Sequence, residues 1–121
     1  MRVRENLTRL STLALERRRQ GLLHRFPPLA ETLRGTVLER YLTCGKPNCQ
    51  CSREKSKRHG PVWYLTVTLG PGRTTGRTLS AEQAPRVRRW VRNYQQTKEQ
   101  LEKISDINRE LLRREGKKAR A

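Results

Sequence analysis

The sequence predicts an α+β fold: an N-terminal helix, a small three-stranded antiparallel sheet with a cysteine-rich loop, and a long C-terminal helix with coiled-coil character. Three observations predict it. Apolar residues recur every three or four positions near the start, which is typical of an amphipathic helix. Apolar and polar residues alternate in the middle of the chain, between glycine and proline turns. The last third opens with a capping box and then contains no helix breaker over a long stretch.

Residues 2–25 are expected to form the first helix, because apolar side chains recur at helical spacing from Val3 to Leu22. Pro27 ends this helix, since proline removes a backbone donor and restricts the residue before it. A short helical piece is expected at residues 29–34 before the sheet begins.

Residues 36–43, 62–69 and 73–79 are expected to be the three strands. The second strand alternates most clearly, so its two faces should differ in polarity. The Pro-Gly pair at 71–72 suits a type II turn, because proline presets one φ and glycine supplies the positive one. We interpret Gly76 as the site of a β-bulge in the third strand.

The long helix should begin at the capping box Ser80–Gln83, run to about Arg114 and end at Gly116. A heptad pattern predicts a seam along it, and a polar Asn108 in that seam can fix register. Two interpretations stay open, and both can hold: the N-terminal helix covers the seam, or the seam forms a homodimer. The seam residues are Val87, Trp90, Tyr94, Leu101, Ile104 and Leu111.

All three cysteines lie in CGKPNCQC, residues 44–51, and a histidine follows, so the spacing is C-x4-C-x-C-x7-H. Three sulfurs and one imidazole are the ligands of a Cys3His structural zinc site. The turn at Lys46-Pro47-Asn48 lets the backbone double back. We therefore expect Zn²⁺ to bind here, with His24 as a substitute for the histidine and reduced, non-ligating thiols as the alternative. The expected ligands are Cys44, Cys49, Cys51 and His59.

The net charge is +17, with 28 lysine and arginine residues against 11 aspartate and glutamate residues. Such a charge attracts polyanions, so nucleic acid is the leading partner and an acidic membrane surface the second. Apolar runs are far shorter than the roughly 20 residues that span a bilayer. MRVRENLTRL has no apolar signal-peptide core. We therefore expect a cytoplasmic, nucleoid-associated protein with no membrane contact.

Basic residues concentrate in the cysteine loop, after the hairpin turn and at the start of the long helix. Between Lys46 and Arg92 the only acidic residues are Glu54 and Glu82. Arginine binds phosphate in a bidentate manner and can read guanine edges. Tyr64, on the strand face opposite Trp63, is the candidate for base stacking. The expected nucleic-acid ligands are Lys46, Arg53, Lys55, Lys57, Arg58, Arg73, Arg77, Arg86, Arg88, Arg89 and Arg92.

The stretch RGTVLERYLTCGKPNCQCSREKSKRHGPVWYLT and the later RVRRWVRNYQQTKEQLEKI resemble a family of short bacterial proteins catalogued as a domain of unknown function. The resemblance covers about residues 34–107. It implies the same cysteine and histidine motif at Cys44, Cys49, Cys51 and His59. It also implies an association with mobile elements, near transposases or recombinases.

No Ser/His/Asp set, phosphate loop or Rossmann glycine pattern is visible, so we expect a non-enzyme. The leading hypothesis is a zinc-stapled, DNA-binding accessory protein of a mobile element that acts with a transposase or recombinase. The alternatives are an RNA- or ribosome-associated basic protein and a coiled-coil adaptor for an acidic protein. The expected segments are 1–33 (N-terminal helical), 34–80 (zinc-loop sheet), 81–115 (long helix) and 116–121 (basic tail).

Overall fold

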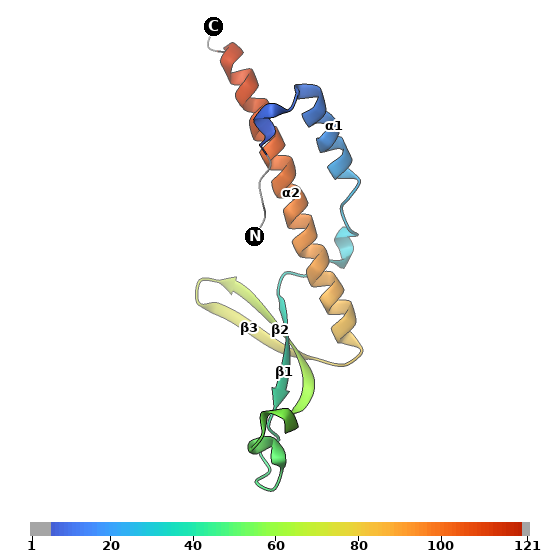
Figure 1. Ribbon diagram of the computed structural model, residues 1–121, viewed down its shortest axis with the longest axis vertical. Coiled ribbons are helices and arrows are strands. Elements are labelled where there is room, and N and C mark those ends of the chain that lie inside the picture. Colours follow the sequence, from blue (N-terminus) through green and yellow to red (C-terminus); the bar gives the residue numbers. More distant parts are fainter. Residues whose placement is uncertain (1–5, 120–121) are drawn as a thin grey trace. The chain divides into compact units, whose positions relative to one another are not determined.

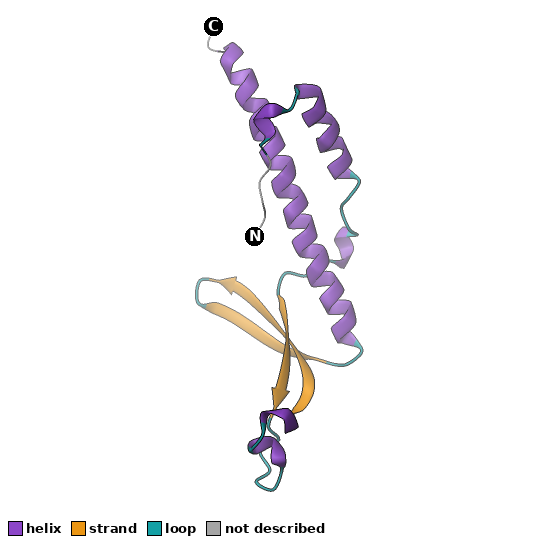
Figure 2. Cartoon of the chain, viewed as in Figure 1, coloured by secondary structure: helices purple, strands orange, loops and turns teal. Residues whose placement is uncertain are grey.

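The α+β fold predicted from the sequence is confirmed in a computed structural model of the chain (Figure 1 and Figure 2). The structure describes residues 6–119, and for residues 117–119 it describes the backbone alone. Among the described residues, no helix is both long enough and apolar enough to cross a membrane. The helices and strands are α1 (Thr12–Leu23), β1 (Thr36–Leu42), β2 (His59–Gly70), β3 (Arg73–Leu79) and α2 (Gln83–Ala119). The described residues also form four 3-10 turns: η1 (Leu7–Arg9), η2 (Leu29–Glu31), η3 (Gln50–Ser52) and η4 (Lys55–Lys57).

The chain forms two compact units. Unit 2 is continuous, Ala30–Tyr94, and holds the sheet, the cysteine loop and the first part of α2. Unit 1 combines the residues up to Leu29 with those from Gln95 onward, so it holds α1 and the rest of α2. Both units therefore include part of α2.

The sheet of unit 2 has the order β1-β2-β3, with both pairings antiparallel. Val37 lies opposite Leu65, and Leu79 lies opposite Trp63, so these four side chains share one face. This face, called here the covered face, packs against Ala84, Val87 and Val91 of α2 to form the core of unit 2. The other face is called here the open face.

The predicted bulge at Gly76 is wrong, because Gly76 pairs regularly with Thr66. The irregularity falls instead between Thr68 and Gly70, next to the turn. Gly76 has another role: a Cβ there would overlap the Tyr64 hydroxyl group. Glycine therefore makes room for the Tyr64 side chain to lie across β3.

The start of α2 follows the predicted capping box. The Gln83 N–H donates to Ser80 Oγ (3.1 Å), and the Ser80 N–H donates to Gln83 Oε1 (3.0 Å). The predicted end at Gly116 is wrong, since α2 continues to Ala119. A single glycine lowers helix stability by about 1 kcal/mol relative to alanine, which a long helix tolerates. The end of the predicted basic tail, residues 120–121, lies outside the described residues.

The predicted first helix begins too early. Residues 2–5 lie outside the described residues, and η1 is separate from α1. Ser11 is extended and its Oγ accepts the Ala14 N–H (3.0 Å), so it caps α1 and starts the helix at Thr12. The apolar spacing continues through the break, which is why the sequence pattern did not reveal it. The short helical piece expected at residues 29–34 is the single turn η2.

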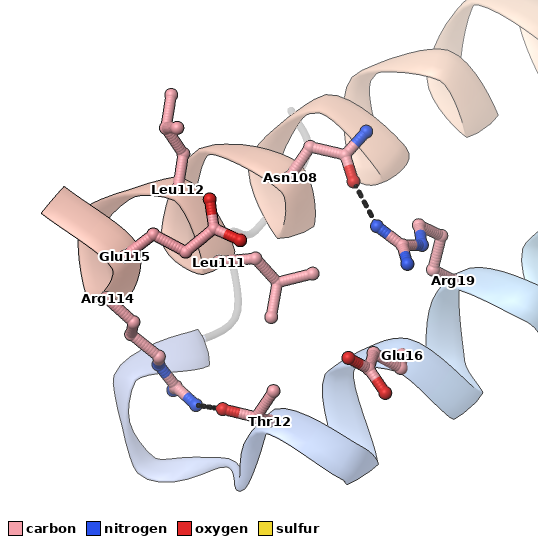
Figure 3. A pocket seen from close by; sticks show the side chains of 8 residues that line it. All are labelled: Thr12, Glu16, Arg19, Asn108, Leu111, Leu112, Arg114 and Glu115. Atoms are coloured by element: carbon pink, nitrogen blue, oxygen red, sulfur yellow. Dashed lines mark hydrogen bonds between the residues drawn. The ribbon is translucent and has the colours of Figure 1, made fainter. Parts of the chain in front are cut away.

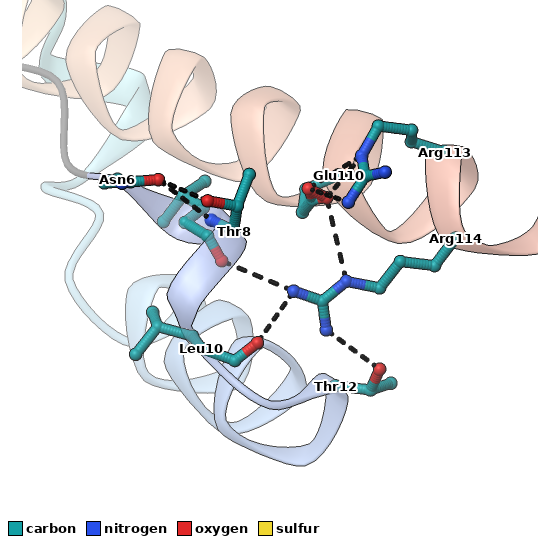
Figure 4. Close-up of polar contacts among 8 residues, drawn as sticks. Asn6, Thr8, Leu10, Thr12, Glu110, Arg113 and Arg114 are labelled. Carbon is teal, nitrogen blue, oxygen red and sulfur yellow. Dashed lines mark hydrogen bonds and ion pairs between the residues drawn. The ribbon is translucent and has the colours of Figure 1, made fainter.

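Unit 1 has its own core, in which Leu15 is 0% exposed and packs with Leu22 and Ile107. Arg114 joins the N-terminal turn to α2 (Figure 4). Its guanidinium donates to the carbonyl oxygen of Leu10 (2.7 Å) and to Thr12 Oγ1 (3.0 Å), and it faces Glu110 at 3.6 Å. Glu110 is only 7% exposed, and the hydrogen bond from Arg113 lowers the pKa of its carboxyl group.

The predicted seam of α2 is divided between the two units. Val87 belongs to the core of unit 2, whereas Ile104 and Leu111 pack on the core of unit 1. Leu101 is 56% exposed. Asn108 Oδ1 accepts a hydrogen bond from Arg19 (2.7 Å) across an open groove of about 730 Å³ between α1 and α2 (Figure 3). Trp90 and Tyr94 are partly buried. Helix α1 thus covers part of the seam within the chain.

Candidate metal centre and its basic surroundings

The cysteine loop joins β1 to β2 and is anchored at both ends by the sheet (Figure 1). Leu42 at the end of β1 pairs with His59 at the start of β2, so Cys44 and His59 stand at the base of the loop. Gly45 has a positive φ of 79°, which glycine adopts without strain. The Cys49 N–H then donates to the Lys46 carbonyl (3.2 Å), which closes the turn through Pro47 as the spacing predicted.

These turns bring all four predicted ligands together. Their sulfur and ring nitrogen atoms all lie within 4.8 Å of one another. Cys44 Sγ is 3.6 Å from Cys51 Sγ, and Cys49 Sγ is 3.3 Å from His59 Nε2. The 3-10 turn η3 allows Cys49 and Cys51, only two residues apart, to face one centre. The cluster contains His59 and not His24, the predicted substitute.

Backbone N–H groups are directed at the sulfur atoms. The Cys44 N–H donates to Cys51 Sγ (3.4 Å). The backbone N–H of Cys51, followed by the Cys51 and Cys44 thiols, lowers the pKa of Cys49. The Cys44 N–H also favours the Cys51 thiolate, but burial and the neighbouring thiols outweigh it, so the net pKa of Cys51 is raised. The three thiols are thus hydrogen-bonded to one another. A metal cation bound at this site would displace the thiol protons and coordinate the thiolates.

The spacing of the donor atoms fits a tetrahedral ion. Metal–ligand distances of about 2.3 Å to sulfur and about 2.0 Å to nitrogen imply edges of about 3.8 Å between two sulfurs and about 3.5 Å between sulfur and nitrogen. The edge from Cys44 Sγ to Cys51 Sγ, 3.6 Å, and the edge from Cys49 Sγ to His59 Nε2, 3.3 Å, are within a few tenths of these values, and every edge is at most 4.8 Å. The cluster can therefore hold a metal ion with four protein ligands.

Residues 12–89 match the family described as Domain of unknown function (DUF6788). The chain belongs to this family. The matched stretch contains α1, the whole sheet, the metal cluster and the start of α2. The family resemblance seen in the sequence is therefore confirmed. No curated protein and no solved structure matches the chain.

Gly60 positions His59 in this DUF6788 member, because its φ is +150° and a Cβ there would lie 2.6 Å from the Arg40 carbonyl oxygen. Gly60→Ala is therefore expected to displace His59 and to weaken metal binding about tenfold. Competition against a chromogenic chelator measures this. Gly70→Ala is the matched control, since a Cβ at Gly70 meets no atom within 4 Å and its φ is unstrained. Equal metal affinity of the two variants would contradict this role for Gly60.

The predicted basic residues of the loop are exposed, and in the sequence they lie between the metal ligands. Lys46, Arg53, Lys55, Lys57 and Arg58 occupy a loop whose single acidic residue is Glu54. Between residues 6 and 119, none of the five has an ion pair with a carboxylate. No carboxylate of the described residues thus pairs with these five cations, which leaves their charge available to a ligand.

Three of the four predicted arginines of α2 contact other side chains of this DUF6788 member. The Arg88 guanidinium lies 4.8 Å from the Trp63 ring centroid, and that of Arg86 lies 5.4 Å from the Trp90 ring. Arg89 pairs with Glu31 at 3.4 Å. Arg92 is exposed. Sequence spacing could not distinguish these engaged arginines from the uncompensated cations of the loop.

Arg40 was missed as a candidate. It is exposed on β1, and its guanidinium lies 4.4 Å from the centroid of the Tyr64 ring. The structure therefore pairs Tyr64, predicted as a base-stacking residue, with an arginine of the same chain. The signal was present in β1, because Arg40 is two residues from Leu38 and so lies on the same face as Leu38, the open face that also carries Tyr64. Arg73 and Arg77 are exposed on β3. Arg73 stands next to the hairpin turn, whereas Arg77 pairs with Leu65 and so lies on the covered face.

Proposed function

We propose that this chain is a non-enzymatic DNA-binding protein whose cysteine loop is shaped by a structural Zn²⁺ ion. Zinc is the ion that a Cys3His donor set with near-tetrahedral spacing fits best. Four protein ligands leave no position for a substrate or a reactive water, which favours a structural role over a catalytic one. Such an ion would also stabilise the fold of the cysteine loop, in which few apolar side chains are buried.

The observation that carries the proposal is the uncompensated charge around the metal cluster. The loop carries five exposed basic residues and one acidic residue. Its base is fixed by the pairing of β1 with β2, and its four candidate ligands lie together. Three thiolates, Zn²⁺ and a neutral histidine together contribute about −1, so the loop stays strongly positive with the metal bound. A rigid positive surface of this kind suits a phosphate backbone.

The proposal extends to a role beside a transposase or recombinase of a mobile element. The family resemblance suggests this context, and DNA binding without catalysis is the contribution that such an accessory protein would make. The RNA-binding and adaptor alternatives are outcomes of the same test.

The test compares binding of labelled duplex DNA and structured RNA by fluorescence anisotropy over a series of salt concentrations. We expect tighter binding to duplex DNA, with an affinity that falls steeply as salt rises, because phosphate binding releases counterions. Equal and weak binding to both nucleic acids would overturn the DNA assignment. Tighter binding to RNA would favour the RNA-associated alternative, and binding to neither would favour the adaptor.

A further inference from the structure

The open face of the sheet is rich in threonine and contains no carboxylate. Register and alternation place five threonines on it, together with Leu38 and Val62. Glu39, the acidic residue of the three strands, alternates with Leu38 and Arg40 and so lies on the covered face. The threonines are Thr36, Thr66, Thr68, Thr74 and Thr78.

This face is accessible within unit 2. Thr68, Thr74 and Thr78 are exposed, Leu38 is 38% exposed, and α2 packs on the opposite, covered face. Threonine offers a hydroxyl group that donates and accepts hydrogen bonds and a methyl group that contacts thymine methyls. The composition therefore suits contact with a ligand that is partly polar and partly apolar at its surface.

Arg40 is held above this face by Tyr64. The Tyr64 side chain lies across Gly76 on β3, and the Arg40 guanidinium lies 4.4 Å from the centroid of its ring. Within the described part of the chain Arg40 has no carboxylate partner. An arginine stacked on an aromatic ring keeps its N–H groups free for an acceptor in the plane of the guanidinium.

Positive charge flanks the face at both ends of β2. The cysteine loop with its five basic residues precedes His59 at one end, and Arg73 follows the hairpin turn at the other. The threonines lie between these two ends, and the pair of Thr68 and Thr74 is next to the turn. In protein–DNA interfaces, cations contact phosphates at the margins while hydroxyl, amide and apolar groups meet base edges inside the groove.

We propose that the open face of the sheet enters the major groove of duplex DNA, with the cysteine loop and Arg73 contacting phosphates on either side. The inference rests on the proposed DNA-binding function and names the surface that performs it. The major groove admits a two-stranded β-ribbon, and β2 and β3 form such an antiparallel pair. Duplex is favoured over single strands because Tyr64, the aromatic residue of this face, is occupied by Arg40 and Gly76 and not free to stack a base.

Thr74→Glu and Thr75→Glu test the proposal as a matched pair. Both residues are exposed on β3, and both variants add the same charge. They differ in position: Thr74 lies on the open face, whereas Thr75 pairs with Val67 and lies on the covered face. A labelled DNA duplex is titrated with each full-length, metal-loaded variant. Thr74→Glu should weaken binding about tenfold or more, since it places a carboxylate against the phosphates, and Thr75→Glu should weaken it much less.

Retained zinc content and thermal unfolding of both variants show that the sheet is intact. Should Thr74→Glu lose its fold, Thr74→Lys replaces it and is expected to tighten duplex binding relative to Thr75→Lys. Equal effects of the paired substitutions on a wild-type protein that binds duplex would overturn the assignment of this face and leave the DNA-binding function standing. A wild-type protein without duplex binding would instead end the proposed function.

Discussion

Cys51→Ser is expected to abolish stoichiometric zinc binding, with affinity falling about a hundredfold or more. Cys51 is the most buried of the four ligands, at 2% exposure, and its sulfur accepts the Cys44 N–H and lies 3.6 Å from Cys44 Sγ. A serine hydroxyl is shorter, harder and not ionised at neutral pH, so it cannot replace a thiolate. The loop would lose its central ligand, and duplex binding should weaken with it.

Metal analysis of the purified protein and chelator competition measure this effect. Gln50→Ala is the control, because Gln50 lies between two ligands and is itself exposed. Chelation of the wild-type protein should reproduce the Cys51→Ser defect, and added zinc should reverse it. Less than half an equivalent of zinc per wild-type chain, together with unfolding that a chelator leaves unchanged, would rule out a structural metal.

The triple variant Lys55→Gln/Lys57→Gln/Arg58→Gln is expected to lower duplex affinity mainly at low salt. If all three side chains contact phosphates, the slope of log affinity against log salt should become shallower by about 2.7, at about 0.9 per contact. Zinc content should stay unchanged, since none of the three is a ligand. Anisotropy titrations at several salt concentrations give the slope directly.

A second triple variant, Arg9→Gln/Arg17→Gln/Lys98→Gln, removes the same charge from unit 1, where all three residues are exposed. It controls for net charge, which attracts DNA over long distances even without contact. We expect a much smaller change in its salt slope. Equal loss in both triple variants would show that binding depends on total charge and not on the loop.

The features that the sequence could predict are those that depend on interactions between residues close together in the chain. The capping box at Ser80 and Gln83, the hairpin turn at Gly72 and the loop ligands depend on residues close together in the chain, and each appears where it was expected. The start of α1 could not be placed, because Ser11 interrupts the helix without interrupting the apolar period. The hydroxyl group of Ser11, which caps the helix, determined where α1 begins.

Pairings between distant segments could not be predicted. The contact of Arg40 with Tyr64 depends on the register of β1 against β2, and that of Arg88 with Trp63 depends on how α2 lies on the sheet. A one-residue change in register would move every side chain of a strand to the other face. The ligand set was therefore predictable from spacing, whereas the division of the arginines into engaged and uncompensated groups needed the structure.

The position of the ligands in the loop has a consequence for sequence variation. Cys44 and His59 stand at the base, where β1 and β2 already hold them, and Cys49 and Cys51 follow a tight turn. The segment from Ser52 to Arg58 contributes no donor atom. Insertions and deletions there should leave the coordination geometry intact, so this segment can diverge in length and charge without rebuilding the metal site. Under the proposed function, such divergence would change which nucleic acid the loop prefers.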